Sequence, residues 1–165
     1  MKKIALLLFV CFFTSCATMT PPQQISRMAF PEHEYQRLAK SGTAIVKGQA
    51  FLKTRSGDVK VAAGNEVILN PITSYSNEWY EKAYRRGMNL GEPDPRVWNY
   101  VIKTVADGSG RFTFKNVPPG QYFVTTVVTW ESATGYQGAL QVQGGTVTKR
   151  TIVNDGDEVE VIVTR

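Results

Sequence analysis

Residues capable of covalent or acid–base catalysis are scarce in this sequence. It contains one histidine, His33, and two cysteines, Cys11 and Cys16. Ser-His-Asp and Cys-His constellations need an imidazole beside the nucleophile, and one isolated histidine ahead of the β-rich part of the chain favours an exposed surface residue. Glycine-rich phosphate loops, G-x-S-x-G elbows and metal-binding His/Cys spacings do not occur. The sequence therefore predicts no enzymatic activity, no cofactor and no metal site.

An acidic cluster near the carboxyl end has a structural explanation. Asp155, Asp157 and Glu158 offer the oxygen ligands that calcium prefers. However, Asn154-Asp155-Gly156-Asp157 is also typical of a tight turn between two strands. We expect a hairpin turn there rather than a calcium site.

The amino-terminal residues are typical of a cleaved signal peptide. Lys2 and Lys3 precede an uninterrupted apolar run over residues 4–13. Such a run is too short to cross a bilayer as a helix, because that requires about 20 residues. We therefore expect residues 1–15 to be removed as a signal peptide rather than retained as a membrane anchor.

Cys16 is the residue for which the sequence indicates a covalent modification. Phe13-Thr14-Ser15-Cys16 resembles the bacterial lipobox, in which a small residue precedes a cysteine that receives diacylglycerol, although Phe13 stands where the family prefers Leu. Cleavage after Ala17, as in ordinary secretion, is the alternative. Cys11 would leave with the signal peptide, so Cys16 would be a lone thiol that cannot form an internal disulfide. We expect Cys16 to be lipidated.

The resemblance also implies a location. An aspartate after the acylated cysteine resembles an inner-membrane retention signal in Gram-negative lipoproteins, and this chain has Ala17 there. The expected location is the outer membrane, with the lipid as anchor and the folded part facing the periplasm.

Residues 16–42 are expected to form a tether with one short helix. Residues 18–26 are polar and contain paired prolines, as linkers do. In residues 30–42, Pro31 can occupy a first helical position, acids precede bases, and Gly42 can end the helix.

Residues 43–165 have the pattern of an all-β domain. Turn residues recur every eight to twelve positions, and apolar residues alternate between the turns. Several short strands of this kind close a core as a sandwich or barrel. We expect strands at residues 43–54, 59–62, 66–70, 98–106, 111–114, 121–131, 140–143, 146–153 and 158–164.

Residues 107–124 carry a family resemblance. DGSGRFTFKNVPPGQYFV resembles the signature D-x-x-G-x-F-x-F-x-x-[VL]-P-x-G-x-Y-x-V of carboxypeptidase regulatory-like domains. That resemblance implies a transthyretin-like antiparallel β-sandwich over residues 43–165, with Phe112, Phe114, Tyr122 and Val124 in its core. Such sandwiches serve as adhesive, stabilising or binding modules, so the resemblance implies a fold more than a function.

Residues 71–97 are expected to be a helical insertion in the sandwich. Ser76 can cap a helix over residues 77–88. On that helix Glu78 and Lys82, and likewise Glu81 and Arg85, are spaced for ion pairs one turn apart. The insertion also carries an aromatic stripe at helical spacing.

This stripe has two interpretations. In the first, it packs on the sandwich and covers an edge or an open face. In the second, exposed aromatic residues form a platform for a glycan, peptidoglycan or a partner protein. The residues of that candidate surface are Trp79, Tyr80, Tyr84, Trp98 and Trp130.

Charge excludes one class of partner. The chain has 19 Lys and Arg against 14 Asp and Glu, and the positive residues form no block, so we expect no nucleic-acid binding. The leading hypothesis is a membrane-anchored, non-enzymatic lipoprotein whose β-sandwich binds a protein partner or supports assembly in the cell envelope. The alternative is a carbohydrate- or peptidoglycan-binding module that uses the aromatic residues of the 71–97 insertion.

Overall fold

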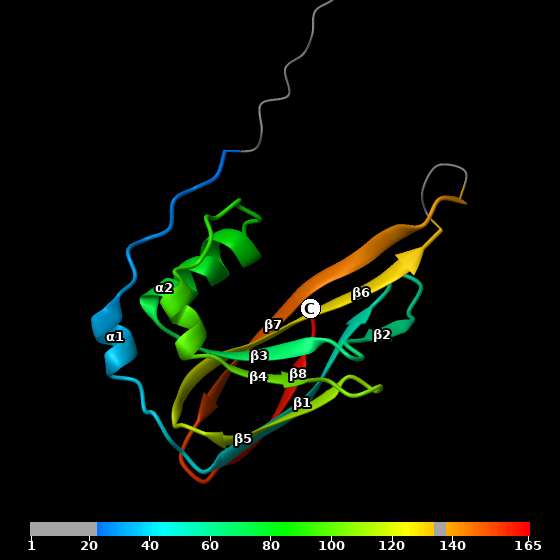
Figure 1. The fold of residues 1–165 in the computed structure, drawn as a ribbon. Coiled ribbons are helices and arrows are strands. Elements are labelled where there is room, and N and C mark those ends of the chain that lie inside the picture. Colours follow the sequence, from blue (N-terminus) through cyan, green and yellow to red (C-terminus); the bar gives the residue numbers. More distant parts are fainter. Residues whose placement is uncertain (1–22, 134–137) are drawn as a thin grey trace, which may run out of the picture.

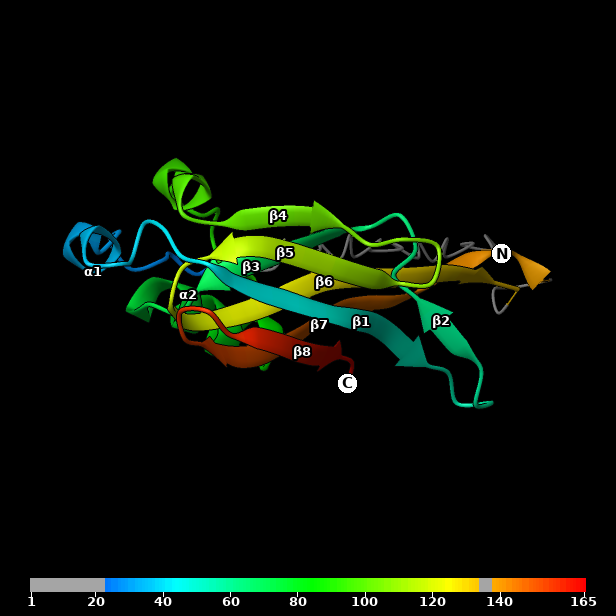
Figure 2. The ribbon, with the colours of Figure 1, turned by 90° about the horizontal axis from the view of Figure 1, so that it is seen from below.

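The alternating apolar residues pair into two stacked β-sheets (Figures 1 and 2). The computed structural model describes residues 23–133 and 138–165, so the predicted signal peptide and Cys16 lie outside the described residues. The first sheet contains β2, β1, β5 and β8, and the second has the order β4-β3-β6-β7. The strands are β1 (Ala44–Lys53), β2 (Val59–Val61), β3 (Glu66–Pro71), β4 (Ile102–Val105), β5 (Arg111–Val117), β6 (Gly120–Ser132), β7 (Gln141–Val153) and β8 (Glu158–Val163).

The space between the sheets is filled by the apolar residues that the sequence pattern assigned to it. In β1, Val46, Ala50 and Leu52 face the core, while Lys47, Gln49 and Phe51 between them face the other way. Phe112 and Phe114 of β5 meet there with their ring centroids 5.8 Å apart. The expected all-β sandwich is confirmed.

The pairing of the first and last strands of the sandwich is parallel. Residues 45–50 of β1 pair with residues 158–163 of β8, while β5 pairs antiparallel on β1 as well. A parallel pair needs a long connection, and here almost the whole domain supplies it. The antiparallel pattern expected from the sequence therefore holds for every pair except this one among the described strands.

Local hydrogen bonds stabilise the two turns within residues 107–124. The Asp107 carboxylate accepts from the Ser109 hydroxyl at 2.7 Å and from the backbone N–H groups of Ser109 and Arg111. These bonds, that of the Ser109 hydroxyl above all, lower the pKa of Asp107. Further along, the Tyr122 hydroxyl donates to the Pro118 carbonyl at 2.8 Å. Asp107 is thus occupied in holding a turn.

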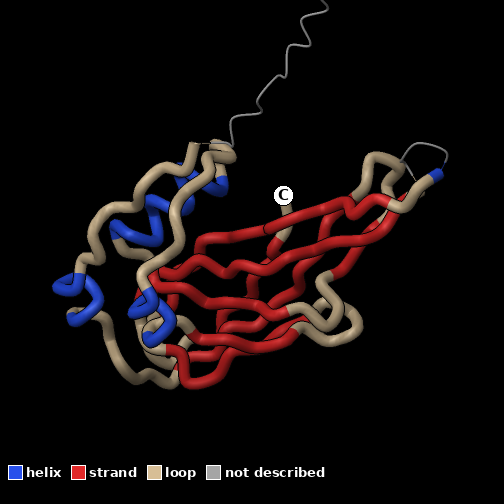
Figure 3. Tube along the Cα trace, turned by 45° about the horizontal axis from the view of Figure 1, so that its top comes forward, coloured by secondary structure: helices blue, strands red, loops and turns tan. Residues whose placement is uncertain are grey.

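Four helical segments gather at one end of the sandwich, and the β6–β7 hairpin projects from the other (Figures 1 and 3). Three of the four lie between β3 and β4, in and just beyond the predicted insertion. No helix among the described residues is both long and apolar enough to span a bilayer. The segments are α1 (Glu32–Gln36), α2 (Ser74–Glu78), the π-helix η1 (Trp79–Tyr84) and the 3₁₀-helix η2 (Pro95–Asn99).

Two predictions about the segments between β3 and β4 are wrong in detail. The helix expected over residues 77–88 begins and ends earlier, because α2 begins at Ser74 and η1 ends at Tyr84. Thr73 is its cap: its hydroxyl accepts from the Ser76 N–H at 3.2 Å, and the Ser76 hydroxyl accepts from the Thr73 N–H at 2.9 Å. Trp98 belongs to η2 rather than to a strand. There Asp94 caps the turn and Pro95 opens it, and these local preferences override the alternating pattern that follows.

Two further boundaries also differ from the sequence pattern. Residues 140–143 and 146–153, expected as separate strands, belong to the single strand β7 apart from residue 140. The expected helix of residues 30–42 is shorter, because α1 ends at Gln36.

Gly48 lies where β1 packs closely against β5 and β8, so a larger residue there tests this packing. A Cβ at this position would lie 2.0 Å from the Val161 carbonyl oxygen and 2.8 Å from the Phe112 ring, whereas one at Gly108 would meet no atom within 4 Å. We expect Gly48→Ala to lower the free energy of unfolding by about 2 kcal/mol through overpacking, measured by chemical denaturation. Gly108→Ala is the matched control, and equal effects of the two substitutions would contradict this account of β1.

Candidate functional site

The outer face of the second sheet is partly covered by the insertion. Along β6, Val124 faces the core, while Phe123 and Thr125 face outward. Phe123 is nevertheless 0% exposed. The ring of Tyr80 stacks on it at 4.8 Å between centroids, and that of Trp79 meets it edge-on at 6.4 Å. The insertion is therefore docked on the sheet through Phe123.

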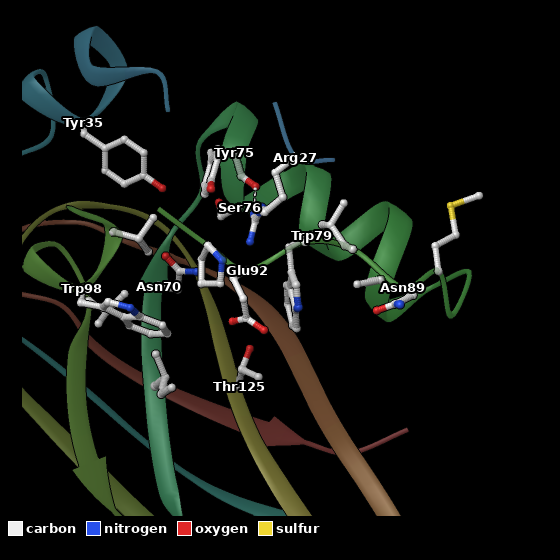
Figure 4. Close-up of a pocket in the computed structure, with 18 residues that line it drawn as sticks. Arg27, Tyr35, Asn70, Tyr75, Ser76, Trp79, Asn89, Glu92, Trp98 and Thr125 are labelled. Atoms are coloured by element: carbon white, nitrogen blue, oxygen red, sulfur yellow. Dashed lines mark hydrogen bonds between the residues drawn. The ribbon is translucent and has the colours of Figure 1, made fainter. Parts of the chain in front are cut away.

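Beside this contact lies a cavity of about 400 Å³ between the insertion and the sheet (Figure 4). Ile68, Asn70 and Thr125 line it from the outer face of β3 and β6. Figure 4 shows Trp79 and Trp98 on either side of the cavity, with the Glu92 side chain directed into it. Its other lining residues are Arg27, Tyr35, Tyr75, Ser76, Ala83, Met88, Asn89, Leu90, Gly91, Pro93, Val97 and Val101.

Two side-chain acceptors of the cavity have no partner within the described part of the protein, and the buried Arg27 Nε atom, a donor, makes no hydrogen bond although it lies 3.8 Å from the Glu78 carboxylate. The Asn70 Oδ1 atom is buried and accepts no hydrogen bond. The Glu92 carboxylate, on an exposed loop residue, has no ion pair with any described side chain. By contrast, the Thr125 hydroxyl is hydrogen-bonded to that of Thr148 at 2.7 Å. A buried acceptor without a donor costs about 1–3 kcal/mol, which a ligand with donors can recover.

The segment before the sandwich contributes to the cavity wall. The Ile25 N–H donates to the Asn89 carbonyl at 2.8 Å, and the Gly91 N–H donates to the Ile25 carbonyl at 2.8 Å. Two residues further on, the Arg27 guanidinium lies 4.0 Å from the centroid of the Tyr75 ring and donates to the Tyr75 carbonyl at 3.1 Å. Residues expected in the tether are thus packed against the insertion.

The Glu78 carboxylate binds residues 27 and 28 of the segment before the sandwich. The Glu78 side chain is only 8% exposed, and its carboxylate accepts from Lys82 at 2.8 Å and from the Met28 N–H at 3.1 Å, with the Arg27 Nε atom at 3.8 Å. Burial by itself would raise the pKa of Glu78, but these hydrogen bonds and the two cations outweigh it and lower the pKa below the ordinary value. The expected Glu78–Lys82 pair is confirmed.

A second apolar cluster positions the loop that carries Glu92. Tyr35, Tyr75 and Val97 are buried together, one from each of α1, α2 and η2. The Tyr75 hydroxyl accepts from the Asp94 N–H at 2.8 Å. Hydrogen bonds from Arg96, first from its side chain and then from its backbone, lower the pKa of Asp94 to about 2. Hydrogen bonds of Gly91 and Asp94 therefore hold the loop on both sides of Glu92. The bond of Asp94 also fixes the start of η2, the segment that contains Trp98.

The structure divides the aromatic residues of the predicted surface. Trp79 and Trp98 line the cavity, and Trp98 is 50% exposed. Tyr80 and Tyr84 do not line it; Tyr80 stacks on Phe123, and Tyr84 stacks on Tyr80 at 5.5 Å. Trp130 is half-buried against the sandwich core, apart from these residues. The stripe is half-buried, so it both covers the sheet and leaves surface open.

The remaining polar candidates have structural roles or stay on the surface. His33 is exposed on α1. The Asp155 carboxylate accepts from the Thr43 N–H and hydroxyl, while Asp157 accepts from the Asn154 N–H and side-chain amide, as the predicted turn requires. In the described ranges, no group of His, Cys, Asp and Glu is placed to hold a metal ion.

Sequence reasoning missed polar residues of the cavity, among them Arg27, Asn70 and Glu92. Arg27 and Glu92 stand in segments that look like linker and loop, and Asn70 alternates with core residues near the end of a strand. A polar residue beyond the apolar run Val67–Leu69 of β3 was the one available signal. Its meaning depends on the insertion that folds over it.

A solved structure is similar to this chain in both fold and sequence. A crystal structure of PA1324 from Pseudomonas aeruginosa, a protein suggested to bind carbohydrate, is 33% identical to this chain. It covers 84% of this chain and 99% of its own, with a TM-score of 0.73. A 9R-lipoxygenase from Cyanothece PCC8801 is 13% identical over 84% of this chain and 18% of its own, and its TM-score of 0.28 supports no shared fold. No protein-family model and no curated protein matches the chain.

Glu78→Gln tests the attachment of residues 25–28. The substitution removes the charge that holds Arg27, Lys82 and the Met28 N–H, so we expect the Met28 amide to exchange its hydrogen at least about tenfold faster. Hydrogen–deuterium exchange at neutral pH measures this. Glu81→Gln, which removes a more exposed carboxylate in the adjoining η1, is the control and should leave Met28 protected.

The same contact should weaken in acid. Because the folded pKa of Glu78 is lowered, its contribution is complete above the unfolded value of about 4.3 and is lost as the pH falls through the folded pKa. Protection of Met28 that does not change on acidification, or that changes equally in Glu78→Gln, would argue against this role.

Proposed function

The chain belongs to the same family as PA1324 of Pseudomonas aeruginosa, and we propose that it is a carbohydrate-binding module of the cell envelope. The observation that carries the proposal is the cavity between Trp79 and Trp98, with the unpaired Asn70 oxygen in its lining. The suggested activity of PA1324 is consistent with it.

The chemistry of the cavity suits a sugar. A pyranose ring has apolar C–H faces and a rim of hydroxyl groups, so it needs flat apolar walls together with hydrogen-bonding groups. Trp79 and Trp98 supply such walls, and Asn70 and Glu92 supply acceptors. A volume of about 400 Å³ is within the range of small-ligand sites.

The proposal includes a lipid anchor at Cys16. The apolar run over residues 4–13 and the lipobox-like Phe13-Thr14-Ser15-Cys16 support it. The module would then lie at the outer membrane and face the periplasm. It would act by binding rather than by catalysis, which is consistent with the structural use of Asp107 and the surface position of His33.

A protein partner is the second candidate function. Leu140 and Val142 are 66% and 70% exposed. They belong to the β6–β7 hairpin, which projects at the end of the sandwich opposite the helical segments (Figure 1). Exposed apolar side chains at the end of a projecting ribbon suit a protein surface better than a sugar. The signature of residues 107–124 fits either role, since a relationship to carboxypeptidase regulatory-like domains would imply a binding module in both cases.

Trp98→Ala tests the sugar site. The substitution removes one wall of the cavity at a half-exposed position, so we expect saccharide affinity to fall about tenfold with little loss of stability. Binding is measured by tryptophan fluorescence and calorimetry with cellotetraose, N-acetylated chitotetraose, its unacetylated glucosamine counterpart and muropeptides. Trp130→Phe, which removes an indole outside the cavity, is the matched control. No response to any of these compounds in the unaltered protein would reject the proposed function.

Cys16→Ser tests the anchor independently. We expect the unaltered full-length chain to fractionate with membranes and to gain the mass of its acyl chains on the mature terminal cysteine. Cys16→Ser should be recovered without that mass, and Cys11→Ser, within the predicted signal, should behave as the unaltered chain does. A mature terminus with an unmodified thiol would contradict lipidation.

A further inference from the structure

Cationic side chains near the cavity lie beside carboxylates, whereas the Glu92 carboxylate has no ion pair with a described side chain. This difference indicates the class of sugar that would fit. Resting on the proposed function, we propose that the cavity selects a saccharide bearing a protonated amine, an unacetylated amino sugar, through the Glu92 carboxylate. Figure 4 shows this side chain directed into the cavity between the two tryptophans.

The cations near the cavity already lie beside carboxylates, although the Arg27 Nε atom makes no hydrogen bond. Arg27 stacks on Tyr75 and lies 3.8 Å from the Glu78 carboxylate, and its side chain is only 9% exposed. Lys82 pairs with that carboxylate at 2.8 Å. Lys103, 5.3 Å from the centroid of the Trp98 ring, pairs with Glu66 at 3.1 Å. None of these three cations forms an ion pair with Glu92.

The unpaired Asn70 side chain also favours a ligand that supplies hydrogen-bond donors. The Asn70 Oδ1 atom is a buried acceptor, and Glu92 is an acceptor as well. An ammonium group provides three donors and no acceptor, whereas an acetamido group would bring its own carbonyl oxygen and a single N–H. Donors on an amino sugar therefore match both acceptors better than those of an acetylated sugar.

The walls would strengthen this recognition. Indole faces attract cations, and Trp79 and Trp98 lie on either side of the site. A neutral sugar of the same size would not gain this attraction.

Glu92→Gln provides the test, because it keeps the shape of the side chain and removes its charge. Calorimetry with the glucosamine tetramer, N-acetylated chitotetraose and cellotetraose measures the three affinities. We expect the glucosamine tetramer to bind about tenfold more tightly than the two neutral compounds, and more weakly as salt is added. In Glu92→Gln this preference and its salt dependence should disappear, while binding of the neutral compounds stays unchanged.

The control and the contrary outcomes separate this inference from the proposed function. Glu131→Gln removes a charge that is also exposed, near the end of β6, and should leave the preference intact. Equal affinities for all three compounds, or an equal loss of all three in Glu92→Gln, would overturn selection of an amine while carbohydrate binding stands. If none of the compounds binds, the proposed function fails as well.

Discussion

The candidate site depends on the contact between Phe123 and the aromatic residues of the insertion. Phe123 points away from the sandwich core and would be exposed on a bare sheet, yet Tyr80 and Trp79 bury it completely. Burying a phenylalanine side chain contributes about 1.5–3 kcal/mol, and aromatic pairing adds to that. This contact fixes the insertion on the sheet, and the cavity is the space that remains beside it.

A second set of contacts completes the walls from outside the sandwich. Glu78 combines two cations and a backbone N–H at one buried carboxylate, which makes the preceding segment part of the folded structure. Such a carboxylate is stable only while its partners remain, because an uncompensated buried charge is costly. The site is therefore assembled from three stretches of chain: residues 25–35, the insertion, and the outer face of β3 and β6.

The sandwich was predictable from sequence because its determinants are local and periodic. Alternation places Val46 and Leu52 inward, and the turn chemistry at Asp107 marks the start of β5. The site was less predictable, because its polar residues acquire their role through distant contacts. Trp79 and Trp98 stood out as aromatic residues, but the strand expected at Trp98 neglected the cap formed by Asp94. Nothing in the residues around Arg27 indicates that it stacks on Tyr75, 48 positions further along the chain.

The backbone pairing of Ile25 with Asn89 and Gly91 limits how far the proposed module could travel from its anchor. Fully extended, the stretch from Cys16 to Ile25 reaches no more than roughly 30 Å, about the thickness of a bilayer's hydrocarbon core. A lipidated protein of this kind would sample only a thin shell above the membrane surface. Polymers lying within that shell would meet it at high local concentration, so even weak individual contacts could hold it in place while it diffuses in two dimensions.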